Sequence, residues 1–137
     1  MKNPSWEECI ENNFAKQITP DTERAKSLIE TAKDRISLIT EINEKNCNFI
    51  FEDYYTSLIE LLQALVLNEG YQILNHLCLG YYLKDKLKRK DLFLIFDDLR
   101  YKRNSLIYYG SKMDFETAKD AIEKCKMLIK EIKGLSK

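Results

Sequence analysis

Arginine, asparagine and tyrosine side chains recur along the segment 91–109 and are the residues of this sequence best suited to chemistry. Arg100, Asn104 and Tyr108 are spaced i, i+4 and i+8, so on a helix they lie above one another on a single face. Arg103 lies at the edge of that face. A guanidinium group binds phosphate bidentately, and a tyrosine ring offers a hydroxyl and a surface on which a base stacks. These residues predict a site for phosphate or a nucleotide.

Three neighbouring side chains extend this predicted site. Tyr109 adds a second phenol for nucleotide binding, and Tyr101 and Asp97 support the face. Asp97 precedes Arg100 by three positions, so it either orients that guanidinium group or neutralises it. A polar subunit interface is the alternative interpretation of the same face, because Arg and Tyr are also enriched at interfaces.

Metal and cofactor chemistry has little support in the sequence. None of the four cysteines, Cys9, Cys47, Cys78 and Cys125, belongs to a C-x-x-C pair, and the nearest two are more than thirty residues apart. A zinc site needs clustered ligands, so we expect no metal and no cofactor. We expect four free thiols in a reducing compartment, with Cys125 filling part of an apolar stripe.

The single histidine, His76, is the only side chain that titrates near neutral pH without perturbation. Its neighbours Leu74, Leu77 and Leu79 predict a half-buried position on a helix. A catalytic role for His76 would require the fold or a second copy of the chain to bring it to the arginine face.

Helical periodicity runs through the whole chain and predicts the elements that position these residues. On the segment 91–109 the side chains of Leu92, Ile95, Leu99 and Leu106 form a core stripe. We predict helices over 6–15, 20–42, 48–67, 71–83, 91–109 and 115–134, with caps at Ser5, Thr19, Asp91 and Asp114 and stops at Gly70, Gly110 and Gly134. The fold class is all-α: a single domain, 1–137, built as an up-and-down helical bundle of about four long helices plus one or two shorter ones.

Charge is balanced overall but uneven along the chain. Residues 1–70 have a net charge of −6 and residues 71–137 a net charge of +6, which predicts either a basic working face or helices of opposite sign that pair. The basic run 84–90 either steers RNA or is a solvated loop. No apolar run is long enough for a membrane span, and the N-terminal segment is acidic, so we expect a soluble cytoplasmic protein.

The segment Arg103-Asn104-Ser105-Leu106-Ile107-Tyr108-Tyr109-Gly110 resembles the signature of HEPN domains, which is Arg, usually Asn, three residues and then His. The segment 51–67 resembles the family's aromatic-then-alanine helix, and 70–76 resembles the Gly-Tyr-x-x-x-x-His stretch of small archaeal members. The resemblance implies a homodimer that brings two motifs together across a cleft. Many members are metal-independent endoribonucleases, some of them toxins paired with a nucleotidyltransferase antitoxin, and others only bind nucleotides or RNA.

The sequence departs from this family at one position, because Tyr108 stands where the family has histidine. A base works best when its pKa is near the working pH, whereas a free phenol titrates near ~10. Arg103 and Tyr108 are the candidate catalytic pair. Because a phenol is a poor base at neutral pH, we expect the protein to bind RNA or a nucleotide, and cleavage is the alternative. The alternatives are an active endoribonuclease and a non-catalytic helical dimerisation or interaction module. We expect the homodimer to use part of the apolar segment 48–67.

Overall fold

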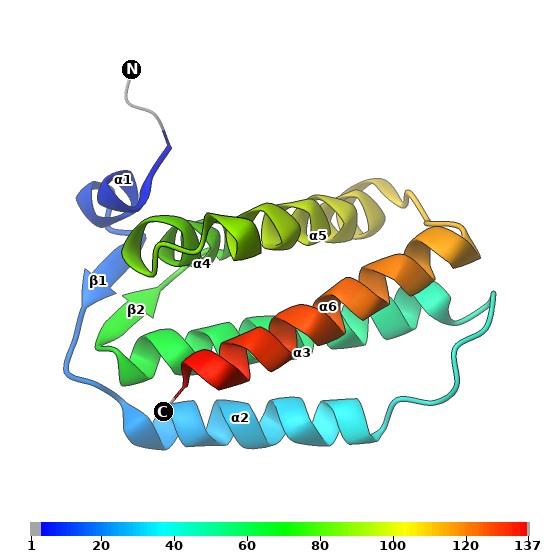
Figure 1. Cartoon of the computed structure of the whole chain (residues 1–137), viewed down its shortest axis with the longest axis horizontal. Coiled ribbons are helices and arrows are strands. Elements are labelled where there is room, and N and C mark those ends of the chain that lie inside the picture. Colours follow the sequence, from blue (N-terminus) through cyan, green and yellow to red (C-terminus); the bar gives the residue numbers. More distant parts are fainter. Residues whose placement is uncertain (1–3, 137) are drawn as a thin grey trace.

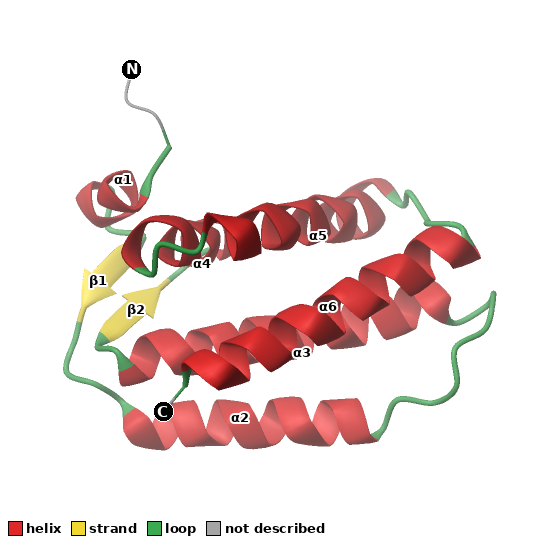
Figure 2. Cartoon of the chain, in the orientation of Figure 1, coloured by secondary structure: helices red, strands yellow, loops and turns green. Residues whose placement is uncertain are grey.

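Four long helices form the body of the protein in the computed structural model, which describes residues 4–136 (Figures 1 and 2). They are α2 (Thr22–Ser37), α3 (Cys47–Asn68), α5 (Lys90–Tyr109) and α6 (Phe115–Leu135), and successive long helices run in alternating directions. The all-α, up-and-down bundle is therefore confirmed. The first three residues of the acidic N-terminal segment and the last residue of the predicted domain 1–137 lie outside the described residues.

Short elements gather at one end of the bundle (Figure 2). They are the helices α1 (Trp6–Glu11) and α4 (His76–Tyr81), the π-helical turn η1 (Tyr82–Lys86), and the strands β1 (Ala15–Gln17) and β2 (Tyr71–Ile73). Among the described residues, no helix is both long and apolar enough to cross a membrane.

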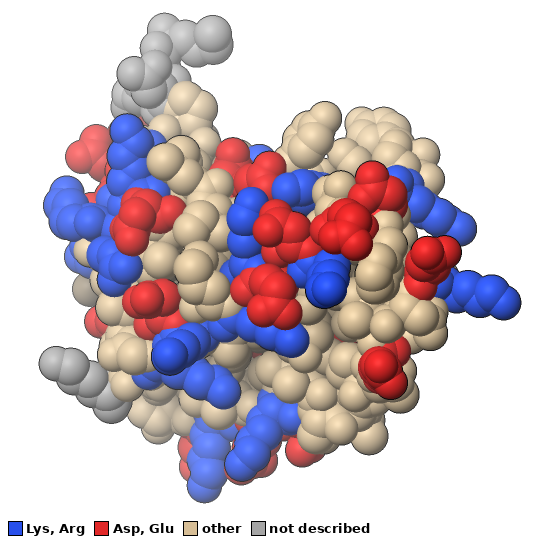
Figure 3. Space-filling model, turned by 45° about the vertical axis from the view of Figure 1, so that its right-hand side comes forward, with Lys and Arg blue, Asp and Glu red and all other residues tan. Residues whose placement is uncertain are grey.

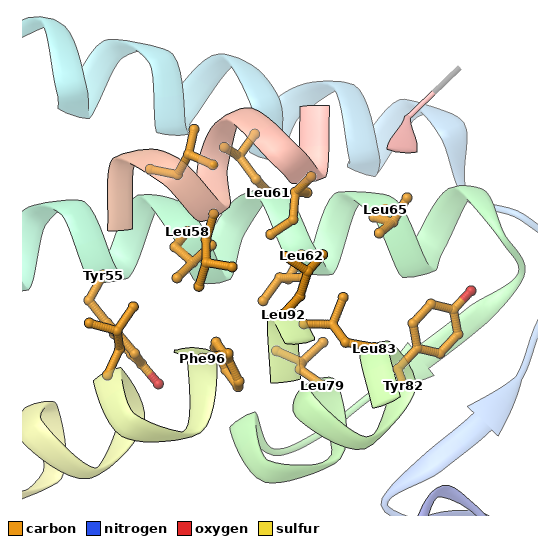
Figure 4. Close-up of a cluster of buried hydrophobic side chains, with 14 of the residues drawn as sticks. Tyr55, Leu58, Leu61, Leu62, Leu65, Leu79, Tyr82, Leu83, Leu92 and Phe96 are labelled. Atoms are coloured by element: carbon orange, nitrogen blue, oxygen red, sulfur yellow. The ribbon is translucent and has the colours of Figure 1, made fainter. Parts of the chain in front are cut away.

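Helix α3 lies at the centre of the core and packs against α2, α5 and α6. Its leucine side chains meet those of α4, η1 and α5, as the cluster in Figure 4 shows. Burial of this apolar surface is the main stabilising contribution to the fold. The monomer covers most of this helix, and the expectation that part of α3 packs against a second copy remains a prediction. Of its large apolar side chains, Phe49 alone is strongly exposed, at 62%.

Strand β2 and the first residue of β1 lie in segments that periodicity predicts as helix. Helix α1 ends at Glu11, and Asn13 adopts a φ of 61°, which turns the chain into β1. The strands pair antiparallel with Ala15 opposite Ile73. Gly70, the predicted stop of the helix before it, has a φ of 87°, a conformation that favours glycine, and lies just before β2. Local periodicity misses this sheet because its two strands are far apart in the sequence.

Both ends of helix α2 differ from their predicted limits. The cap of α2 is Asp21, whose carboxylate accepts a hydrogen bond from the Arg24 amide, so Thr19 does not cap it. Helix α2 ends at Ser37, and residues 38–46 form a loop that side-chain bonds of Asn43 and Asn46 organise. Asparagine side chains compete for backbone groups in this way and disfavour helix.

One predicted cap and one predicted stop are corrected at the helices α5 and α6. Arg89, not Asp91, precedes α5 as its N-cap residue, and it has no side-chain cap bond. Helix α6 continues through Gly134 and ends at Leu135, so Gly134 is not its stop. The predicted cap at Asp114 and the left-handed stop at Gly110 are confirmed.

A disulfide between Cys9 and Cys78 joins α1 to α4, which corrects the expectation of four free thiols. Trp6 supports the same contact: its ring packs edge-on against Tyr71 and Tyr82, and its amide donates to the Asp85 carboxylate at 2.9 Å. The expectation of a reducing compartment relied on free thiols and loses that support, because disulfides persist mainly in oxidising compartments.

The other two cysteines, Cys47 and Cys125, are free and buried. Burial raises the pKa of the Cys125 thiol to about 12, so this side chain stays protonated at neutral pH and acts as an apolar core residue. The predicted role of Cys125 in the apolar stripe is confirmed.

Candidate functional site

A shallow depression of about 510 Å³ lies between the start of α4 and the C-terminal half of α5. Four of the predicted site residues, Arg100, Arg103, Asn104 and Tyr108, line it together with residues 74–77. The helical spacing of the α5 residues therefore places them along one side of the depression. The wall formed by α4 is contributed by the tertiary structure.

Close packing brings α4 against α5. A side-chain carbon added at Gly80 would lie 3.1 Å from the Phe93 ring and 3.2 Å from the Phe96 ring, so a larger residue here would require these rings to shift by a few tenths of an ångström. Asn75 caps α4 by accepting a hydrogen bond from the Cys78 amide at 2.8 Å. These contacts place His76, the first residue of α4, beside the arginines of α5.

The Arg103 guanidinium group lies between two aromatic rings. Its carbon is 5.8 Å from the centre of the Tyr55 ring and 6.0 Å from that of the Tyr108 ring, distances typical of cation–π contacts. Its Nη1 also donates to the Asn104 side-chain oxygen at 3.4 Å. Among residues 4–136, Arg103 has no acidic partner within ion-pair distance. Its positive charge is therefore available to an anion in the depression.

Arg100 differs from Arg103 because a carboxylate already compensates its charge. Its Nε and Nη2 atoms both donate to one oxygen of Asp97, at 3.1 and 3.0 Å. Both predicted effects of Asp97 are present: the pair orients the guanidinium group and offsets its charge. Arg103 is consequently the stronger anion-binding group of the two.

His76 joins this site, and the sequence gives no local signal for that. Its Nδ1 is hydrogen-bonded to the Tyr55 hydroxyl at 3.1 Å, and Tyr55 itself is buried on α3. Burial lowers the pKa of His76, and the positive charges of Arg103 and Arg100 lower it further. Burial raises the pKa of Tyr55 above its ordinary value, so this phenol stays neutral. The half-buried helical position predicted for His76 is confirmed.

Three predicted site residues do not line the depression: Asp97, which pairs with Arg100, and the tyrosines Tyr101 and Tyr109. Tyr109 and Tyr101 are 81% and 70% exposed. Tyr101 lies further around α5, on the same side as Leu94 and Tyr108. Tyr108 thus borders both the depression and a second, more apolar strip of α5.

The basic run 84–90 lies at the opposite end of α5 from the depression, about 20 Å from Arg103 along the helix axis. Part of its charge is already engaged: Lys84 lies 3.8 Å from Asp85, and Arg89 pairs with Asp91 at 3.0 Å and with Glu131 at 3.8 Å. Figure 3 shows basic and acidic side chains interspersed over one face of the molecule. The uneven charge of the two halves of the chain does not produce a uniformly basic surface on that face.

Within residues 4–136, no cluster of three or more His, Cys, Asp or Glu side chains is arranged to hold a metal ion. Comparisons of the chain with protein-family models, curated proteins and solved structures find no match. The chemistry of the site is therefore the basis for its functional interpretation.

Proposed function

We propose that the protein binds RNA or a nucleotide at the depression between α4 and α5, with Arg103 holding a phosphate group. The observation that carries this proposal is a guanidinium group without an acidic partner among the described residues, beside an open depression. An arginine in this state binds phosphate strongly because its charge-assisted hydrogen bonds are directional.

The groups around Arg103 favour a nucleotide over a simple anion. Tyr108 is 68% exposed, so one face of its ring is open to stack on a base. Asn104 provides an amide that both donates and accepts hydrogen bonds. These side chains occupy the positions of the HEPN-like motif, which adds to the proposal by resemblance alone.

Binding of a short single-stranded oligoribonucleotide tests the function through its salt dependence. We expect saturable binding that weakens between 50 and 200 mM NaCl, with a slope of log K against log salt of about −0.7 for each phosphate contact. Fluorescence anisotropy measures both quantities. Absence of saturable binding at the lowest salt would contradict the proposal.

A matched variant locates the contact. Lys86→Ser with Lys88→Ser removes two exposed charges of the basic run, and we expect it to leave the slope unchanged because the run lies far from the depression. A lower slope in this variant would move the phosphate site to the basic run. Analysis of the bound RNA for fragments ending in a cyclic phosphate tests the alternative function, an endoribonuclease.

The exposed strip of α5 favours a second function for the same helix, the assembly of two copies. Leu94, Tyr101 and Tyr108 are spaced by seven residues and are 57%, 70% and 68% exposed. Seven-residue spacing of large side chains is typical of helices that pack side by side. We propose that a homodimer forms through this strip, which would set the depressions of the two copies near each other.

Sedimentation equilibrium tests this dimer. We expect the unmodified chain to form dimers at micromolar concentration and Tyr101→Lys to sediment as a monomer, because a charge at the centre of the strip is desolvated on association. Phe49→Lys on α3 is the matched control and should remain dimeric. Loss of the dimer in the Phe49 variant alone would place the interface on α3.

A further inference from the structure

We propose that the depression selects a terminal phosphate, that is, a phosphate monoester, and that His76 takes up a proton when this group binds. The proposal rests on the proposed function and names the chemical class of the ligand. It follows from the placement of His76 in the depression with Arg103 and from the balance of charge there.

The geometry leaves one edge of the His76 ring available to a ligand. Nδ1 is engaged by the Tyr55 hydroxyl at 3.1 Å, and Nε2 is on the opposite edge of the imidazole ring. Nε2 has no hydrogen bond within the part of the chain that the structure describes. Since His76 lines the depression, this nitrogen is the atom that donates to a bound phosphate oxygen.

Tyr55 suits both protonation states of the histidine. When His76 is neutral, the phenol donates its proton to Nδ1, and Nε2 carries the ring proton. When His76 is protonated, Nδ1 donates and the phenol oxygen accepts. A hydroxyl group serves both roles without a change of position, so Tyr55 is a positioning residue that keeps Nε2–H directed to the ligand at either charge.

The balance of charge distinguishes a phosphate monoester from a phosphodiester. Asp97 offsets the charge of Arg100, which leaves Arg103 as one uncompensated positive charge. An internal phosphodiester of RNA carries one negative charge, which Arg103 balances. A monoester carries between one and a half and two negative charges, roughly, at neutral pH, and the excess is neutralised when His76 becomes a cation.

His76 takes up a proton on binding because the unliganded site disfavours the cationic form of this histidine. The groups that act on His76 are Arg103 and Arg100 of α5 and the neutral phenol of Tyr55 on α3, and burial with the two arginines lowers the His76 pKa. A bound dianion opposes those charges and raises the pKa. Affinity for a monoester should therefore increase as the pH falls from about 8 to about 6, below which the phosphate group itself takes up a proton.

Two oligoribonucleotides of one sequence test the selection, one with a 5′-phosphate and one with a 5′-hydroxyl. At pH 7.0 we expect the phosphorylated RNA to bind about tenfold more tightly, the effect of one added charge-assisted contact. Calorimetry in two buffers of different ionisation enthalpy should show net proton uptake for the phosphorylated RNA only. AMP as a third ligand separates the two sources of the group: affinity equal to that of the phosphorylated RNA indicates a mononucleotide, and weaker affinity indicates an RNA end.

The variant His76→Gln is the matched control, because glutamine keeps a hydrogen-bonding side chain without a titratable group. We expect the variant to lose the tenfold preference and the proton uptake, so that it binds the phosphorylated RNA and the 5′-hydroxyl RNA with equal affinity. The chain contains one histidine, so its proton NMR signal also reports the pKa in the unmodified protein, and that pKa should rise when AMP binds.

The two proposals fail in different ways. Equal affinity for both RNAs, with no proton uptake and no rise of the His76 pKa, would overturn the monoester proposal while RNA binding itself stands. If neither RNA nor AMP binds at low salt, the proposed function fails with it.

Discussion

Reduction of the Cys9–Cys78 disulfide is expected to lower the free energy of unfolding by about 4 kcal/mol. The bond closes a loop between residues 69 positions apart in the sequence, and a cross-link over so long a loop removes much of the conformational entropy of the unfolded chain. A change of this size is a large fraction of the stability of a single domain. It exceeds the stabilisation expected from any single hydrogen bond of the fold.

Guanidinium unfolding with and without a reductant measures this effect, and a thiol titration of the denatured protein shows which cysteines are paired. We expect two free thiols before reduction and four after it, since Cys47 and Cys125 are free. The variant Cys9→Ala with Cys78→Ala should unfold near the midpoint of the reduced protein, with no further response to reductant. Four thiols in the untreated protein would show that the bond does not form.

Replacement of Arg103 by alanine is expected to weaken RNA binding by about one to two orders of magnitude. Charge-assisted hydrogen bonds contribute about 1.5–3 kcal/mol each, and Arg103 is the cation of the depression whose charge no described carboxylate offsets. The slope of log K against log salt should fall by about 0.7, the contribution of one phosphate contact to a single strand. Because the side chain is only partly buried between two rings, the variant should remain folded.

Lys102→Ala is the matched control, because it removes the same charge from the adjacent position of α5. Lys102 is paired with Asp98 and does not line the depression, so we expect its variant to bind RNA nearly as the unmodified protein does. Equal losses in both variants would indicate a response to net charge alone. If Arg103→Ala binds RNA as tightly as the unmodified protein, dimer formation through the exposed strip of α5 would be the main function of this helix.

The long helices and one face of the site were predictable because their determinants are local. Apolar side chains at helical spacing place Leu92 and Leu99 in the core, and both are buried. The same periodicity places Arg100, Asn104 and Tyr108 on one face, and all three line the depression. Capping chemistry is equally local, which is why the start of α6 at Asp114 was predictable.

Several features depend on contacts between distant segments, and local patterns do not report them. The Cys9–Cys78 pair, the β1–β2 sheet and the coverage of α3 each join residues far apart in the sequence. Helical periodicity describes which face of a segment is apolar, but it does not say which partner covers that face. The segments 15–17 and 71–73 therefore pair as strands although their surroundings predict helix.

The all-α bundle and the arginine face of α5 follow from local sequence alone, since backbone hydrogen bonding and side-chain spacing within one helix are sufficient for both. The placement of His76 and Tyr55 beside Arg103 depends instead on how the helices pack. The close approach of α4 and α5 at Gly80 brings the histidine to Arg103, and the packing of α3 brings the phenol to the histidine. Hydrogen bonds between side chains of different helices depend on how those helices pack, and that packing depends on the whole chain.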